Sequence, residues 1–119
     1  MIFTNEQMHD SIQVLSQTRE EKGLLGYALA VNLRKLSTTP ELAEYARKRD
    51  ELLAQHGTDK GGGKYDLGPV ALAAFCAGLQ PFAKIETDVA VMQVAPEVFY
   101  SGNLTSAQMY ALGWMVKEE

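Results

Sequence analysis

The sequence predicts a mainly helical α+β domain, in which an antiparallel helical hairpin is accompanied by flanking helices and a small two-stranded β ribbon. Apolar residues recur at spacings of three and four over most of the chain, which is typical of amphipathic helices. Only residues 85–94 alternate between apolar and polar side chains as a half-buried strand does. The length of 119 residues and the lack of an internal repeat indicate one domain, residues 1–119.

Composition and charge limit the classes of function. Hydrophobic residues make up 46% of the chain and charged residues 22%, as in ordinary globular proteins. The net charge of −4 argues against a nucleic-acid partner, which needs clustered basic side chains. Cys76 is the only cysteine, so an intramolecular disulfide and a cysteine zinc site are excluded.

The chain is expected to be cytoplasmic and to have no membrane partner. Its first ten residues lack the basic start and apolar run of a secretion signal. The uncharged stretch 23–33 is shorter than the ~18 residues that a membrane span requires.

The first helix is predicted to begin after Thr4. The Thr4 hydroxyl and the Gln7 side chain have the spacing of a capping box, which satisfies two backbone N–H groups at a helix start. Met8, Ile12 and Leu15 follow at helical spacing and are expected to face the core.

Residues 23–57 are predicted to be the centre of the fold, either as two consecutive helices or as one helix interrupted near Pro40. Residues 24–36 are apolar nearly all round, which is typical of a central helix or of a subunit interface. The strongest apolar stripe contains Leu25, Ala28, Leu29, Asn32, Leu33 and Leu36. Asn32 is either a buried amide that fixes register or a polar residue that reaches a cap or solvent; both remain open.

Thr39, Pro40 and Glu41 have the cap, first-turn proline and acidic residue of a helix start. The helix is predicted to end near Gln55, and to pack against the preceding one as a hairpin from Leu24 to Gln55. Its inner face is expected to contain Leu42, Tyr45, Ala46, Arg49, Leu52 and Leu53.

The second half of the chain is predicted to hold the β ribbon and two further helices. Residues 58–64 contain three consecutive glycines, so no regular structure is expected there, only a mobile tip or a hairpin turn. Lys64–Leu67 is expected to be a short strand that pairs with Ile85–Val94, or else the latter pairs with a second copy. A helix should open at Pro69 and end or kink at Pro81.

The last helix is predicted to run from Ser106 to about Lys117. Thr105 and Gln108 repeat the capping-box spacing at its start.

Few residues suggest chemistry. His9 and His56, the only histidines, lie on separate elements and lack the spacing of metal ligands. Glu86 and Asp88 share one strand face and are expected to be a solvated edge rather than a catalytic pair. Cys76 lies among small and apolar residues and is expected to be a buried, unreactive thiol. The sequence therefore predicts no catalytic residue, cofactor or metal site.

An apolar helix with Ala28, Asn32 and Leu36 is followed by a charged helix and by a terminal Leu-Thr…Gln…Ala-Leu helix. The residues that mark the last two are Tyr45, Arg49, Leu52, Leu53, Leu104, Thr105, Gln108, Ala111 and Leu112. In this order of signals the chain resembles small uncharacterised proteins encoded by bacteriophages and prophages, although it departs from them at Pro40 and at the triple glycine. The resemblance implies a small accessory or assembly protein in a bacterial host cell, without catalytic residues.

We expect a non-enzymatic protein that acts by protein–protein contact and self-associates through helices. Its partner is expected to be a second copy in a homo-oligomer, with a dimer favoured, or another protein. Residues 24–36 carry more apolar surface than one packed face needs, and could pair with residues 42–53 of a second copy. The residues expected in this contact are Leu25, Leu29, Asn32, Leu33, Leu36, Tyr45, Arg49 and Leu52. The alternative is a small ligand-binding domain or enzyme that uses acidic residues and histidines in a cleft.

Overall fold

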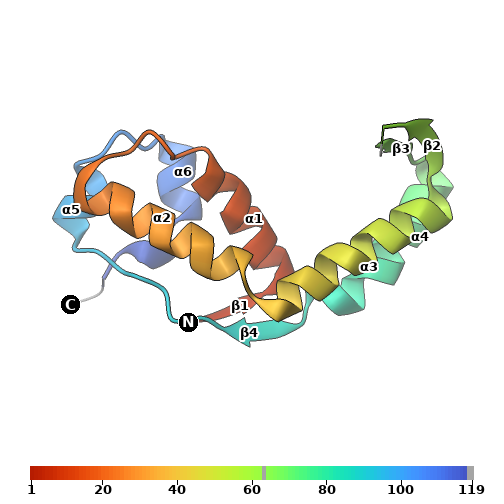
Figure 1. Cartoon of the computed structure of the whole chain (residues 1–119), viewed down its shortest axis with the longest axis horizontal. Coiled ribbons are helices and arrows are strands. Elements are labelled where there is room, and N and C mark those ends of the chain that lie inside the picture. The colour runs from red at the N-terminus through yellow and green to blue at the C-terminus, as the bar shows by residue number, and fades with distance from the viewer. Residues whose placement is uncertain (63, 118–119) are drawn as a thin grey trace.

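A two-helix arm projects from a helical body (Figure 1). The computed structural model describes residues 1–62 and 64–117. The molecule measures 47 × 26 × 22 Å and has a radius of gyration of 16.6 Å, whereas a compact domain of this length has a radius of about 13–14 Å. The arm accounts for this elongation.

The described residues form a mainly helical α+β structure, as the sequence predicts. In chain order the elements are β1 (Ile2–Thr4), α1 (Asn5–Ser16), α2 (Gly23–Ser37), α3 (Pro40–His56), β2 (Thr58–Gly61), β3 (Lys64–Asp66), α4 (Pro69–Ala83), β4 (Glu86–Asp88), α5 (Pro96–Tyr100), α6 (Ser106–Ala111) and the 3-10 turn η1 (Gly113–Met115).

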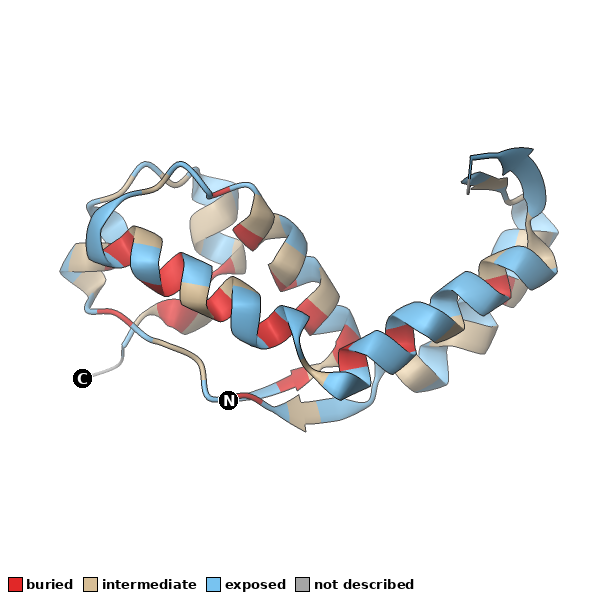
Figure 2. Ribbon diagram, viewed as in Figure 1, coloured by how far each residue is buried: buried red, intermediate tan, exposed pale blue. Residues whose placement is uncertain are grey.

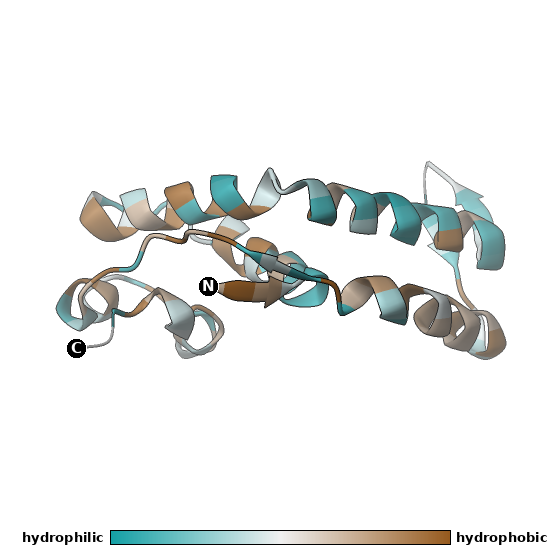
Figure 3. Cartoon of the chain, turned by 90° about the horizontal axis from the view of Figure 1, so that it is seen from below, coloured by the Kyte–Doolittle hydropathy of each residue, from teal (hydrophilic) through white to brown (hydrophobic). Residues whose placement is uncertain are grey.

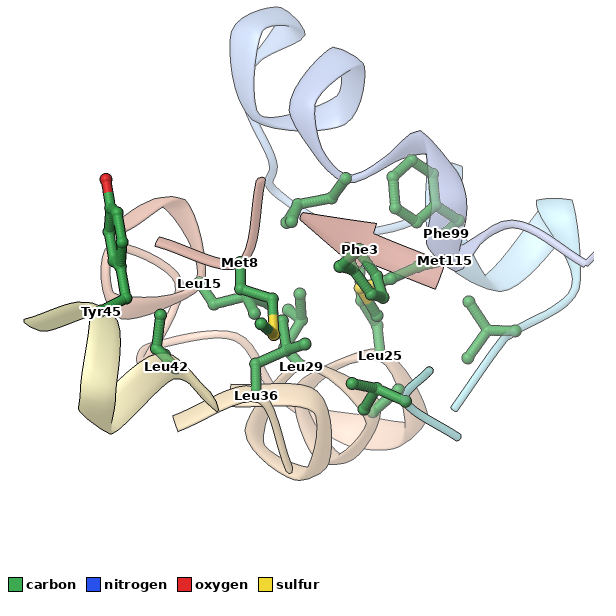
Figure 4. Packing of buried hydrophobic residues seen from close by; sticks show 14 of the residues in the cluster. Phe3, Met8, Leu15, Leu25, Leu29, Leu36, Leu42, Tyr45, Phe99 and Met115 are labelled. Carbon is green, nitrogen blue, oxygen red and sulfur yellow. The ribbon is translucent and has the colours of Figure 1, made fainter. Parts of the chain in front are cut away.

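The hydrophobic core lies in the body, where α2 packs against α1 and against the chain after β4 (Figures 2 and 4). The predicted inner residues of α1, Met8 and Leu15, are buried, and Ile12 packs against them. The buried residues of α2 are those of the predicted stripe except Leu33, which is half-buried. The largest side chains without solvent exposure are those of Phe99, Met8, Leu15, Leu36, Leu112 and Met115, together with the amides of Asn5 and Asn32.

Both predicted capping boxes are present. The Thr4 hydroxyl accepts from the Gln7 backbone N–H at 3.1 Å, and the Gln7 side chain accepts from the Thr4 backbone N–H at 2.9 Å. Thr105 and Gln108 make the same reciprocal pair. The last helix is shorter than predicted, because α6 ends at Ala111 and the chain continues into the 3-10 turn that begins at Gly113, a poor helix former.

The predicted hairpin between residues 24 and 55 is wrong in its pairing. Two consecutive helices form, with a break at Thr38 and Thr39, but α2 and α3 follow one another nearly end to end (Figure 1). The Thr38 and Thr39 hydroxyls donate to backbone carbonyls of the last turn of α2, at 2.9 and 3.1 Å. The chain does not reverse at this break, so α3 leaves the body and forms its helical hairpin with α4.

The predicted β pairing is also wrong. Lys64–Asp66 is a strand, but it pairs with Thr58–Gly61, the segment in which no regular structure was expected. This hairpin turns through Gly61 and Gly62, whose φ angles of +86° and +62° favour glycine; the third glycine lies outside the described residues. The predicted strand Ile85–Val94 is shortened to Glu86–Asp88, which pairs instead with Ile2–Thr4, the strand just before α1.

The chain after β4 runs extended along α2 and is held there by Asn32. The Asn32 side chain is fully buried, and its Nδ2 donates to the Met92 carbonyl at 2.9 Å while its Oδ1 accepts from the Met92 N–H at 2.7 Å. Of the two expectations for Asn32, the buried amide is therefore correct. It pairs with backbone of the same chain, where a side-chain amide supplies the two hydrogen bonds that a neighbouring strand would supply.

Asn32→Ala should lower the free energy of unfolding by about 3 kcal/mol, because it leaves the Met92 N–H and carbonyl without partners inside the protein. Asn103→Ala is the matched control, since Asn103 is exposed and should change stability by less than about 0.5 kcal/mol. Urea denaturation followed by circular dichroism measures both. Equal stabilities of the two variants would contradict a structural role for the Asn32 amide.

Candidate interaction surfaces

The residues expected to contact a second copy lie mostly inside this chain. Leu25, Leu29, Asn32, Leu36, Tyr45 and Leu52 are buried, Leu33 is half-buried and Arg49 is exposed. Helix α1 and the chain after β4 cover the α2 stripe, and α1 and α4 lie against the inner face of α3. A buried side chain of the folded monomer is not available to a partner, so any contact between copies must use other surfaces.

The opposite side of α2 provides one such surface. Leu24 and Tyr27 are 54% and 63% exposed, and Ala30 is exposed between them and the helix end. The sequence predicts this surplus of apolar residues but places the contact on the stronger stripe, which the body itself covers.

A groove of about 750 Å³ lies between this side of α2 and the extended chain after β4. Its lining consists of Tyr27, Ala30, Val31, Arg34, Lys35 and Met92. We call it the α2 groove. Its lining is apolar except at one end, where Lys35 Nζ donates to the Ala90 carbonyl at 2.6 Å and Arg34 is exposed.

The arm has a charged side and an uncharged side (Figure 3). On α3, Arg47 pairs with Glu44 at 2.8 Å and also with Glu51. The Arg47 hydrogen bond and charge lower the pKa of the Glu44 carboxyl. These exposed ion pairs form the solvated face that keeps α3 in water.

The two helices of the arm hold together along a narrow seam. Leu52 of α3 and Phe75 of α4 are buried, 5% and 9% exposed. A Cβ on Gly78 would lie 3.0 Å from a Leu52 methyl group, so the glycine permits the close approach of the helices. At its base the arm is tied to the body, because Asn5 Nδ2 donates to the Phe82 carbonyl at 2.9 Å.

The outward side of α4 is apolar and exposed. No residue of this 15-residue helix is charged, yet Val70 and Leu72 are 85% and 47% exposed. We define the α4 outer face as Val70, Leu72, Ala73, Cys76 and Ala77, all of which are exposed. A helix that is apolar on all sides is normally covered on all sides, so this face is the strongest candidate for a contact.

Cys76 is exposed, which corrects the expectation of a buried thiol. The prediction failed because a run of small apolar residues was taken for a core helix, whereas the arm has only one partner for α4. Cys76 opens into a hollow of about 450 Å³ that Glu6 and Tyr45 also line. Burial, and then the Glu6 carboxylate, raise the pKa of the Tyr45 phenol.

The four residues of the ligand-binding alternative lie in three separate places, with Glu86 and Asp88 together on β4 and each histidine elsewhere. His9 contacts Gln13 on α1 at 3.1 Å, and His56 is the last residue of α3, at the outer end of the arm. Asp88 accepts from the N-terminal amine at 2.9 Å, and Glu86 is exposed on β4. Within residues 1–62 and 64–117, no hydrogen bond or ion pair joins any two of these groups, and no cluster of three or more metal-ligating side chains occurs.

Leu52→Ala should lower the free energy of unfolding by about 2–3 kcal/mol, because it leaves a cavity in the seam of the arm. Leu72→Ala, the same change on the exposed side of α4, should cost less than about 1 kcal/mol. Urea denaturation gives the stabilities, and hydrogen exchange of the α3 and α4 amides shows where protection is lost. Equal losses of protection for the two variants would contradict the orientation of the arm.

None of the helices among the described residues is long and apolar enough to cross a membrane. No protein-family model, curated protein or solved structure matches the chain. The α2 groove and the α4 outer face are therefore the features from which function is inferred.

Proposed function

We propose that the protein is a non-enzymatic interaction protein that self-associates through the α4 outer face, in the manner of a small phage or prophage assembly protein. The observation that carries the proposal is a charge-free helix, with Gln80 as its one amide side chain, whose outer half faces solvent on a projecting arm. Exposed apolar surface of this kind marks protein contact sites.

The energetics favour covering the α4 outer face. Its exposed residues recur at helical spacing and form one continuous strip along a helix about 22 Å long. Burial of apolar surface is worth roughly 25 cal/mol per Å² removed from water. Val70 is 85% exposed, so a large part of its surface can still be buried by a partner.

A second copy is the partner that fits this face best. Two α4 helices carry no charges that would repel each other, and Ala73 and Ala77 let the helix backbones approach closely. A two-fold axis places the same surface on both sides of such a contact. Two arms would then form a four-helix arrangement with the charged α3 helices outside.

The two-fold arrangement has a definite centre. Cys76 is the eighth of the fifteen residues of α4. When two α4 helices pack antiparallel over their full length, their midpoints meet. The Cys76 thiols of the two copies then lie on facing sides of the axis.

The resemblance to small phage and prophage proteins supports an assembly role over catalysis. The separation of His9 and His56 from each other and from the β4 carboxylates supports it as well. The homo-oligomer, with a dimer favoured, is the partner that the sequence itself suggested, now proposed through a different surface.

Ala73→Lys should weaken self-association at least about tenfold, because it places two ammonium groups in the apolar contact. Ala54→Lys is the matched control, since Ala54 is exposed on α3 and outside the contact. Sedimentation velocity over a range of protein concentrations measures both. A wild-type chain that stays monomeric at all concentrations, or equal behaviour of the two variants, would refute self-association through α4.

Cross-linking tests the geometry separately. A short bismaleimide should join two wild-type chains through Cys76, the only cysteine, in the concentration range where sedimentation shows dimers. The Ala73→Lys chain should react at Cys76 but remain uncross-linked, which controls for thiol access. A dimer that forms without any cross-link would contradict the antiparallel contact centred on Cys76.

A further inference from the structure

The α2 groove lies outside the proposed self-association contact on the arm. It lies on the body, on the side of α2 away from the core, and α4 contributes nothing to its lining. Tyr27 forms one wall and is 63% exposed. Tyrosine and arginine are the side chains enriched where binding energy concentrates in protein contacts.

The groove is held in a fixed shape. Met92 is fixed by the two hydrogen bonds between its backbone and the buried Asn32 amide, of 2.9 and 2.7 Å. Lys35 is fixed at the cationic end by its hydrogen bond to the Ala90 carbonyl. A preformed surface binds with less loss of conformational entropy than one that must be ordered first.

The charges of the groove have one sign. Arg34 and Lys35 are its only charged lining residues, and neither forms an ion pair in the described part of the chain. The chain as a whole carries a net charge of −4. This cationic end on an acidic protein selects a carboxylate, and the apolar floor of Ala30, Val31 and Met92 selects apolar side chains.

We propose that the α2 groove binds a short segment of a partner protein in which apolar side chains are followed by an acidic residue. The apolar side chains lie against Val31 and Met92, and the carboxylate accepts hydrogen bonds from Arg34. A small-molecule ligand is normally buried over about 70–90% of its surface, whereas this groove is partly open to solvent. An anionic membrane is disfavoured because the lining has two basic side chains, Arg34 and Lys35, whereas recognition of anionic lipids uses clusters of about 4–8.

Selection from a displayed library of random peptides, with the full wild-type chain immobilised, tests the proposal. We expect enrichment of peptides with apolar residues followed by Asp or Glu. Affinity of an enriched peptide, measured by fluorescence anisotropy, should fall at least about tenfold in Arg34→Glu. Lys64→Glu makes the same charge change on the ribbon of the arm and should leave the affinity unchanged.

A matched peptide with Gln in place of its acidic residue should bind both Arg34→Glu and the wild type equally weakly. No enrichment, enrichment of peptides without acidic residues, or an unchanged affinity in Arg34→Glu would overturn the proposal. Preference for anionic vesicles over the peptide would overturn it too. A change in the sedimentation of the Arg34→Glu chain would instead assign the groove to a second copy. Peptide binding that is retained in the Ala73→Lys chain would show that this site is separate from the arm contact.

Discussion

The body of this protein depends on the pair of hydrogen bonds between the Asn32 amide and the Met92 backbone. After β4 the backbone pairs with Met1 at Val89 and with the 115–117 segment at Val94. Between these points the Met92 peptide groups face α2 and need a partner in the interior. One side-chain amide on the buried stripe of α2 supplies both a donor and an acceptor. This segment packs against the hydrophobic core, and its Met92 also lines the α2 groove.

The break at Thr38 and Thr39 divides the molecule into a body and an arm. Because the chain keeps its direction at this break, α3 leaves the core and pairs with α4 instead of α2. The body contains most of the buried core residues, whereas the arm buries a single seam between two helices (Figure 2). A two-helix arm has only one inner face, which explains why half of an uncharged helix is left in solvent.

The sequence predicted most helix starts and the inner faces of α1 and α2, because caps and apolar periodicity are local signals. It also predicted Lys64–Asp66 as a strand and an excess of apolar residues. It did not predict the buried, hydrogen-bonded Asn5 or the exposure of Cys76. Both depend on where α3 leaves the body and where α4 returns to it. The spacing of apolar residues along the sequence does not specify these positions.

The sequence by itself determined a mainly helical α+β chain without a disulfide and with more apolar helical surface than one core can cover. Only the tertiary structure decided which helices pair, which strands meet and which apolar faces stay outside. The physical reason is that local propensity specifies an element and its inner face, while its partner is chosen by the direction of the chain at each junction. At Thr38 and Thr39 that direction moved the helical hairpin from α2–α3 to α3–α4, and with it the surface available to a partner.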